Sequence, residues 1–527
     1  MKARSKRSKP KQGKDSSTSK LTSFLQLELP LFAIAESAPQ SSETILSDKL
    51  PTCNLSTQKQ KSSETSVQDS TSKERDCVPY WTDLCREISS RLLLPVVTDS
   101  LGLDSSLFST SSNKTVDKSW FLTKLYTAQN QNLPKIFSQS SILTLVECTG
   151  LENTVKRSRK IRLYLTVAQR QLLKQWFGVS RFVYNQTIEY LQQPGTKANW
   201  KAIKGGILSS LPDFCKPIPY QIKSIAVKDA CKAVSNAKIK FTNGGGISRM
   251  RFRSRKDPVQ SCYIPKSAVS SSGIYHTILG EASFAEALPP RFGDCRLVFA
   301  YGDYYLTVPS NVPRQQVENQ GRVVALDPGI RSFITFFSET SFGELGSAAN
   351  LKIQKLCFRL DKLISKFSKA KCKQKKRMKK AATRIRGKIK HLVDELHKKT
   401  ARFLVDNFDV ILLPTFETSQ MSKKAKRRIR SKSVRQMLTL SHYKFKQFLK
   451  HKAFENSKVV LDVNEAYTSK TVSWTGEIVH NLGGAKFIKS KLDGRVMPRD
   501  WNGARGIFLR ALVDTPSLKE HLSDCIC

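Results

Sequence analysis

An unbroken apolar stretch that ends in an acid is the strongest constraint on this fold. The stretch RVVALD ends at Asp327, a Pro-Gly turn follows, and a second apolar stretch, FITFF, comes directly after it. Such runs predict two core strands joined as a hairpin, with Asp327 at the end of the first. Two other acids lie at similar boundaries: Glu417 follows the apolar stretch VILLP, and Asp500 precedes NGARGIFLRAL, which is predicted to be a helix.

Folding is expected to bring these three acids together. At a separation of about 4 Å and an effective dielectric constant near 20, each carboxylate pair would cost about 4 kcal/mol unless a cation lay between them. A divalent metal site is the usual reason for such a cluster. Each acid also has a simpler interpretation: any of them could be a solvated loop carboxylate, and Asp500 could cap the helix that follows it.

The charge of the chain points to a polyanionic partner. Lys and Arg number 89 against 43 Asp and Glu, which gives a formal net charge of +46 and a sequence pI near 10.0. This excess predicts contact with nucleic acid. It does not separate an enzyme from a basic ribosomal or chromatin-type binding protein.

Length and composition divide the 527 residues into four parts. Residues 1–155 are rich in Ser, Thr, Gln and Lys and are expected to be mostly disordered. Residues 156–315 are predicted to form a nucleic-acid-binding lobe, residues 316–515 a second folded domain, and residues 516–527 a tail. The opening cluster MKARSKRSKPKQGK favours nuclear import, with a loose nucleic-acid arm or a solubilising tail as alternatives.

Cysteine usage and hydropathy indicate the compartment. The 12 cysteines form no CxxC pair, and the N-terminus carries no signal-peptide pattern, so a reducing intracellular compartment is expected. Together with the basic cluster, this favours the nucleus. No apolar run is long enough to span a bilayer, so no membrane partner is expected.

The lobe is predicted to combine helices with a small β-barrel. KIRLYLT indicates a strand, and the spacing of Leu172, Trp176, Val179 and Val183 predicts a helix with these side chains in the core. A second helix is predicted after Pro219. Short strand candidates, including CRLVFAY and YYLTVPS, follow up to about residue 312 and suggest the barrel.

A run of alternating arginines lies in RMRFRSRKD. In a strand, its period of two would place every arginine on one face, where the charges favour a nucleic-acid backbone. A solvated edge strand protected by charge is the alternative. The four residues are Arg249, Arg251, Arg253 and Arg255.

The last 200 residues alternate strand and helix patterns. After the hairpin, residues 385–396 carry one apolar stripe, and the basic segment 368–380 is predicted to connect and flank a helical pair. VILLP and KVVLDV predict two more core strands before the closing helix. A strand hairpin, helices, two strands and a helix is the order of an RNase H-like α/β fold.

These residues also resemble a known family. DPGIR, LLPTFETSQM, NEAYTSKT and RDWNGAR, in this order and spacing, resemble the Fanzor proteins, eukaryotic relatives of TnpB that are similar to type V CRISPR effectors. The resemblance covers about residues 157–512. It implies an RNA-guided DNA endonuclease whose residues 316–515 form an RNase H-like RuvC nuclease domain, encoded by or derived from a transposable element.

The resemblance also implies the site residues and partners. Asp327 and Asp500 match the first and last catalytic acids, and Glu417 matches a variant position three residues beyond the strand end. Together they would hold two Mg²⁺ or Mn²⁺ ions. The implied partners are a guide RNA of the omega RNA type and target double-stranded DNA, bound by a protein monomer. A catalytically decayed relative that only binds RNA or DNA, and an unguided RuvC-type nuclease or transposase, remain as alternatives.

Two further sets of residues complete the predictions. Backbone contacts to nucleic acid are assigned to the alternating arginines and to basic runs at Lys373, Lys375, Lys376, Arg377, Lys426, Arg427 and Arg428. The family usually inserts a zinc ribbon, here at about residues 468–498, but its cysteine positions hold Val472, Thr475, Ser490 and Asp493. Because no thiolate is present and His480 cannot replace four ligands, no structural zinc is predicted.

Overall fold

The structure, a computed structural model, covers most of the chain beyond residue 152. It describes residues 81–87, 92–98, 102–103, 108–110, 120–128, 153–248, 250–315, 321–415, 422 and 430–515, all within the unit Asp76–Cys527. Several predicted features lie outside the described residues, so their predictions stay untested: the basic N-terminal cluster, Arg249, Glu417, Lys426, Arg427 and Arg428.

The apolar stretch before Asp327 forms β12, an interior strand of a seven-stranded mixed sheet. β12 pairs antiparallel with β13 and parallel with β15, and β15 pairs parallel with β16. In order across the sheet the strands are β16 (Val459–Val463), β15 (Val410–Pro414), β12 (Val323–Pro328), β13 (Ile334–Ser338), β14 (Ser341–Leu345), β4 (Leu122–Ala128) and β3 (Phe108–Thr110). The predicted hairpin and the two later core strands are therefore present.

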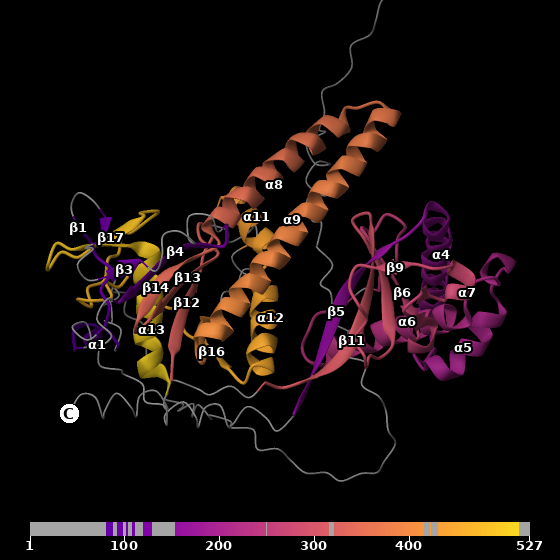
Figure 1. The fold of residues 1–527 in the computed structure, drawn as a ribbon, viewed down its shortest axis with the longest axis horizontal. Helices are drawn as coiled ribbons and strands as arrows, with labels where there is room; N and C mark the ends of the chain where they lie inside the picture. Colours follow the sequence, from indigo (N-terminus) through magenta and orange to yellow (C-terminus); the bar gives the residue numbers. More distant parts are fainter. Residues whose placement is uncertain are drawn as a thin grey trace, which may run out of the picture. The chain divides into compact units, whose positions relative to one another are not determined.

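Helices cover both faces of this sheet, which is why its central strands are unbroken apolar runs. On one face, Ala325 packs with Trp501 of the closing helix. On the other face, Leu326 joins a core built with the helical pair. Figure 1 shows the closing helix and the helical pair on opposite sides of the strands. The helices are α13 (Arg499–Asp514) on the first face, and α8 (Ser347–Ser368), α9 (Cys372–Asn407), α11 (Ser431–Leu440) and α12 (His442–Glu455) on the second.

A buried charge cluster lies where three parallel strands begin. Asp409 precedes β15 and is fully buried. Its carboxylate accepts hydrogen bonds from the Arg322 amide at 3.0 Å and the Arg322 guanidinium at 3.3 Å, and it pairs with the Lys458 ammonium. Burial alone would raise the pKa of Asp409, but these partners hold it below its ordinary value. The charge at this edge of the sheet is therefore compensated inside the protein.

Segments from the first 155 residues are built into the C-terminal domain. β4 extends the central sheet by pairing with β14, and Trp81 and Cys85 are fully buried in the core beside α13. A second sheet joins β1 (Val97–Thr98) and β2 (Gly102–Leu103) to β17 (Phe487–Lys489) and β18 (Val496–Pro498). For these segments, which include α1 (Thr82–Glu87), the predicted boundary at residue 155 is wrong. Their partners lie more than 200 residues away in sequence, so no local pattern could have indicated the pairing.

The lobe contains a five-stranded antiparallel sheet with its own core. The two predicted helices are present, and a capping box between Thr166 and Gln169 begins the first. Trp176, Val179 and Val183 are buried as predicted, whereas Leu172 is only half-buried and its neighbour Leu173 is buried instead. The sheet order is β6-β10-β11-β5-β9, and within the described residues β6 and β9 do not pair. The structure therefore has an open sheet where a barrel was predicted.

The helices and strands of the lobe have the following residue ranges. The helices are α4 (Val167–Leu191), α5 (Trp200–Ser209), α6 (Tyr220–Thr242) and α7 (His276–Leu279). The strands are β5 (Thr154–Tyr164), β6 (Val259–Ile264), β7 (Val269–Ser270), β8 (Gly273–Ile274), β9 (Ser283–Phe284), β10 (Cys295–Ala300) and β11 (Asp303–Pro313). Among the helices that the structure describes, none has both the length and the apolar character needed to cross a membrane.

Candidate functional site

Asp327 and Asp500 meet between the central sheet and the closing helix. Asp327 is the fifth residue of β12, and Asp500 lies in the first turn of α13. Gly503, one turn after Asp500, faces Asp327 so closely that a Cβ added to it would lie 2.6 Å from Asp327 Oδ2. The absence of a side chain at residue 503 therefore lets the helix carry Asp500 up to the strand that carries Asp327.

Glu465 is a third acid at this place, and the sequence interpretation missed it. It follows β16 by two residues, and β12, β15 and β16 run parallel. The carboxyl ends of parallel strands lie at one edge of a sheet, so Glu465 reaches the same edge as Asp327. Its negative charge acts directly on Asp327. The available signal was an acid two residues after the KVVLDV strand, similar to the pattern that singled out Asp327 and Glu417.

The three acids are protonated more easily than ordinary carboxylates. Burial raises the pKa of Asp327 well above its usual value, and the charges of Asp500 and Glu465 raise it further, while Arg499 opposes them. Burial also raises the pKa of Glu465 and of Asp500; Arg331 lowers the latter and Glu344 raises it. In contrast to the Asp409 edge, this edge of the sheet holds negative charge without full compensation.

The acids fit a hard divalent cation by the chemistry of their donors. Carboxylate oxygens are preferred ligands of Mg²⁺ and Mn²⁺, and a cation would relieve the repulsion that raises the pKa of Asp327. Within the described residues, no three Asp, Glu, His or Cys side chains already form a group that could hold a metal ion. The alternative in which Asp500 caps its helix is wrong, because the N-cap of α13 is Pro498.

Gly503→Ala should destabilise the protein, although alanine normally favours a helix. The new methyl group would press on the Asp327 carboxylate, and overpacking of this kind costs about 1–3 kcal/mol. Chemical denaturation measures the change. The matched control is Gly205→Ala in α5, where nothing lies within 4 Å of an added Cβ and a gain of about 0.4–1 kcal/mol is expected. Equal effects of the two substitutions would contradict the close approach.

The predicted arginine strand is absent. Residues 250–255 are irregular backbone between α6 and β6, so the strand interpretation is wrong. Arg253 points into the lobe, where its guanidinium stacks 3.7 Å from the centre of the Tyr184 ring and lies 3.4 Å from Asp229 Oδ2. The main chain of Arg253 exchanges two hydrogen bonds with the Asn185 side chain. These partners come from α4 and α6, so local alternation could not reveal them. Arg251 and Arg255 are exposed.

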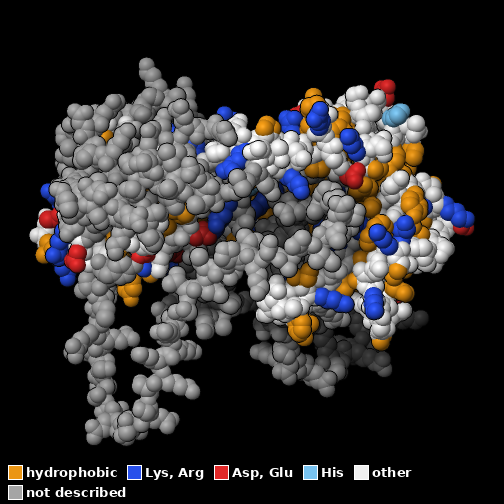
Figure 2. Space-filling model, turned by 90° about the horizontal axis from the view of Figure 1, so that it is seen from below, with side chains coloured by type: hydrophobic (Ala, Val, Ile, Leu, Met, Phe, Trp, Pro, Cys, Tyr) orange, Lys and Arg blue, Asp and Glu red, His pale blue; other side chains and the backbone are white. Residues whose placement is uncertain are grey.

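Other predicted basic residues lie at the start of α9. Lys373, Lys376 and Arg377 are exposed and Lys375 is half-buried. They follow the turn between α8 and α9, as the sequence predicted for a helical pair. On the face shown in Figure 2, Lys and Arg side chains are spread over the described surface and outnumber the acids. This distribution suits contact with a long polyanion at several points.

The ribbon positions hold side chains that pack or form hydrogen bonds. Val472 is fully buried in the core beside α13. The hydroxyls of Thr475 and Ser490 both donate to the Glu477 carboxylate, and Asp493 accepts from the Trp474 indole at 2.7 Å. The two turns where cysteine pairs would stand are therefore side by side, but their donor set does not fit zinc, which prefers thiolate and imidazole ligands.

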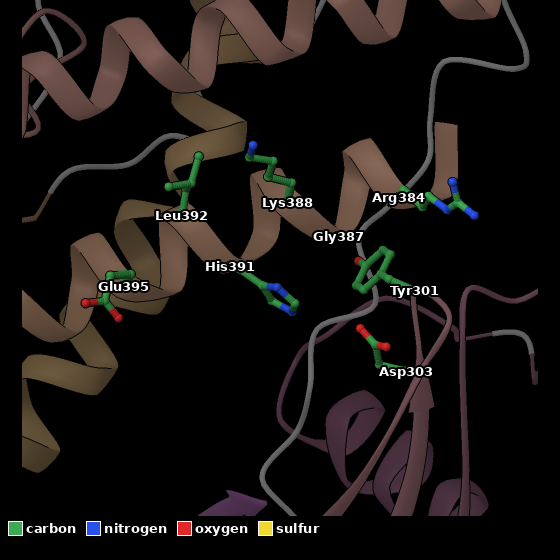
Figure 3. A pocket seen from close by; sticks show the side chains of 8 residues that line it. All are labelled: Tyr301, Asp303, Arg384, Gly387, Lys388, His391, Leu392 and Glu395. Atoms are coloured by element: carbon green, nitrogen blue, oxygen red, sulfur yellow. The ribbon is translucent and has the colours of Figure 1, made fainter. Parts of the chain in front are cut away.

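A pocket of about 500 Å³ lies between α9 and the β10–β11 turn. Figure 3 shows Tyr301 and Asp303 from that turn opposite Arg384 and His391 of α9. Its remaining lining residues are Gly387, Lys388, Leu392 and Glu395. Neither Asp327, Glu465 nor Asp500 lines it, so it is separate from the acidic site.

Three segments match known families. Residues 306–425 match OrfB_IS605, described as "Probable transposase"; residues 153–194 match its "Helix-turn-helix domain"; and residues 442–507 match "Cas12f1-like, TNB domain". The last two acids in the site fall within the third segment, and Asp327 falls within the first.

Relatives in two viruses match along most of the chain. "TnpB-like protein L79" of Acanthamoeba polyphaga mimivirus is 24% identical over 414 residues, which cover 71% of this chain and 77% of the relative. A protein of Paramecium bursaria Chlorella virus 1, named for a transposase, is 26% identical over 422 residues, covering 74% and 95%. The solved "Cas12f1-sgRNA-target DNA complex" superposes with a TM-score of 0.38 at 11% identity over 68% of this chain and 99% of that chain, too loosely to carry an argument. By its sequence, the chain is therefore similar to viral TnpB-like proteins along most of its length, and to the OrfB_IS605 family over residues 306–425.

Proposed function

We propose that this protein is an RNA-guided DNA endonuclease of the Fanzor type with an RNase H-like, RuvC-type nuclease domain. The observation that carries the proposal is the close approach of Asp327 to the start of α13, which carries Asp500, at the edge of the sheet where Glu465 lies near enough for its charge to act on Asp327. The sheet order supports the fold: an antiparallel hairpin with a third strand, then two parallel strands, with helices on both faces. The transposase-type relatives support the same assignment.

The geometry suggests how these residues would act. Asp327, Glu465 and Asp500 would hold Mg²⁺ or Mn²⁺, which in such sites activates water and stabilises the leaving oxygen of a phosphodiester. The sheet fixes Asp327, and the first turn of α13 fixes Asp500. Arg331 and Arg499 lie close enough to lower the pKa of Asp500, so they are placed to orient a phosphate beside the acids. Water activation requires the acids in their ionised forms.

RNA guidance is supported by charge and by likeness to guided nucleases. A net charge of +46 suits a protein that holds both a guide RNA and its DNA target, and the exposed residues at the start of α9 are candidate backbone contacts. The match of residues 442–507 to a family named after Cas12f1 agrees with this partner class. Base pairing would supply the choice of sequence, and the protein would grip the duplex through its phosphates.

The test is cleavage by the protein purified with its co-expressed RNA. We expect Mg²⁺-dependent cutting of a DNA duplex that matches the co-purified RNA, no cutting of a scrambled duplex, and loss of cutting after RNase treatment. Cutting that survives RNase would favour an unguided nuclease or transposase. Binding of RNA and matched DNA without any cutting, across the flanking sequences tried, would favour a decayed relative that only binds.

Glu465→Gln should reduce cleavage about 100-fold or more, whereas Glu417→Gln should leave it near wild type. Losing a charged ligand removes several kcal/mol of transition-state stabilisation, and Glu465 is the glutamate, among the described residues, whose charge acts on Asp327. Initial cleavage rates of the two variants at saturating Mg²⁺ measure the difference. The reverse ranking would assign the third acid to Glu417, as the sequence predicted.

A further inference from the structure

The segment between β16 and α13 has the form of a metal-bridged ribbon without the ligands for a metal. Its first turn is closed by the amide of Val472, which donates to Glu477 O at 2.7 Å, and by the amide of Gly476, which donates to Val472 O at 2.9 Å. Its second turn joins β17 to β18 and is closed by Ser490 N donating to Arg495 O at 3.0 Å. In such ribbons one ion normally bonds to both turns. Here something else must hold them together.

The Glu477 carboxylate occupies the junction between these turns. It accepts hydrogen bonds from the Thr475 hydroxyl at 2.9 Å within its own turn, and from the Ser490 hydroxyl of the other turn. The amides of Lys491 at 3.1 Å and Leu492 at 3.5 Å also donate to it. One side chain thus receives four different donors, of which three come from the opposite turn.

Neighbouring contacts complete the junction. The fully buried Ser490 hydroxyl oxygen accepts from the amides of Leu492 at 3.2 Å and Asp493 at 3.4 Å. The Trp474 indole, from the first turn, donates to Asp493 Oδ2 of the second. Burial alone would raise the pKa of Glu477, but the hydrogen bonds from Ser490, Thr475 and the two amides hold it below its ordinary value. The carboxylate is therefore anionic near neutral pH.

We infer that Glu477 takes the structural place of a metal ion: its carboxylate, through donors on both turns, holds the ribbon together in a metal-independent way. The charge is inverted relative to a zinc centre. A cation gathers anionic thiolates, whereas here an anion gathers neutral O–H and N–H donors, which is the stronger class of hydrogen bond. The Glu477 carboxylate thus does the work that cysteine-bound zinc would do in such a ribbon, and the inference holds whether or not the chain cuts DNA.

The ribbon also supports the helix that carries Asp500. The amide of Ser473 donates to Asn502 Oδ1 at 2.9 Å, and Asn502 Nδ2 donates to Thr471 O at 2.8 Å. The buried Arg505 guanidinium donates to Ser473 O. Asn502 and Arg505 both belong to α13, so a loosened first turn would withdraw partners from two buried polar side chains of that helix.

Hydrogen exchange of the full-length protein tests the inference. In the wild type, we expect less than one zinc per ten chains by elemental analysis, and the amides of residues 487–498 should exchange equally fast with EDTA, with added ZnCl₂ or with neither. In Glu477→Gln, the amides of Lys491 and Leu492 should exchange at least about 10-fold faster, because the new NH₂ group faces donors and the charge is lost.

Two further variants keep the test sharp. Glu286→Gln removes an exposed carboxylate with one ion pair to Arg159, and it should leave the exchange of residues 487–498 unchanged. Ser490→Ala removes one hydroxyl donor but keeps the Glu477 carboxylate, so the amides of residues 487–498 should exchange faster than in the wild type. The increase should be smaller than in Glu477→Gln. This milder variant still tests the inference if Glu477→Gln does not fold. Stoichiometric zinc, acceleration of the wild type by EDTA, or unchanged exchange in both Glu477→Gln and Ser490→Ala would overturn the inference.

Discussion

Asp327→Asn should abolish guide-directed DNA cleavage, reducing its rate at least about 10³-fold, while leaving the fold as stable as before or more stable. A loss of this size corresponds to about 4 kcal/mol, which is within what a charged metal ligand contributes to the transition state. Stability should not fall, because the carboxylate is already disfavoured by burial and by the charges of Asp500 and Glu465. A neutral side chain of the same shape removes that repulsion.

Three measurements on the same preparation separate this outcome from simple misfolding. Cleavage of a matched duplex should be lost, binding of that duplex should be kept, and the thermal midpoint should be equal or higher. The control is Asp361→Asn, which removes a carboxylate of α8 that pairs with Arg435 on the other face of the sheet and should leave cleavage intact. Persistent cutting by Asp327→Asn would remove the basis of the proposed site.

A chain that begins at residue 129 should fail to fold its C-terminal domain. It would lack β4, which pairs with β14, the buried Trp81, and the Leu93 carbonyl that accepts a hydrogen bond from Arg505 at 3.1 Å. Truncating one fully buried tryptophan costs about 3–5 kcal/mol, and most domains are stable by only about 5–15 kcal/mol. Soluble yield and circular dichroism of the shortened chain measure the outcome.

Single substitutions in the same N-terminal segments should reduce stability in proportion to how deeply the side chain is buried. Trp81→Ala in the full chain should lower the free energy of unfolding by about 3–5 kcal/mol. Arg86→Ala, which removes an exposed side chain with one hydrogen bond to the Thr475 carbonyl, should cost about 1 kcal/mol. A folded, soluble chain beginning at residue 129 would show that the domain does not need the N-terminal segments in order to fold.

The elements that were predicted best from the sequence are those whose pattern of apolar and charged residues extends over only a few neighbouring positions. The unbroken apolar runs of β12 and β15 are explained by helices on both faces, and the basic turn between α8 and α9 was visible as charge between two helical patterns. Asp327 and Asp500 followed from their places at the ends of such elements. Their convergence at Gly503 needed the tertiary structure, because nothing in the local sequence says which strand a helix meets.

The errors have the same physical origin. An arginine at every second position fits a strand and an irregular loop equally well, and Asp229 and Tyr184, which bind Arg253 inside the lobe, are distant in sequence. β4 mixes apolar and polar residues, and it pairs across more than 200 residues. An acid follows VILLP and another follows its parallel neighbour β16, and the local sequence does not distinguish Glu465 from the first of these acids.

The two ends of the three parallel strands differ in how well their buried acids are compensated, and this difference has a consequence for nucleic-acid binding. Where they begin, Asp409 is neutralised internally by Arg322 and Lys458; where they end, the charges of Asp500 and Glu465 act on Asp327 without full compensation. A phosphate chain drawn to the basic exterior would be repelled at that one spot until a cation arrived. The protein should therefore bind nucleic acid in EDTA, but the scissile phosphodiester should enter the acidic site only when magnesium is present. Binding and positioning for cleavage would then be two separable steps.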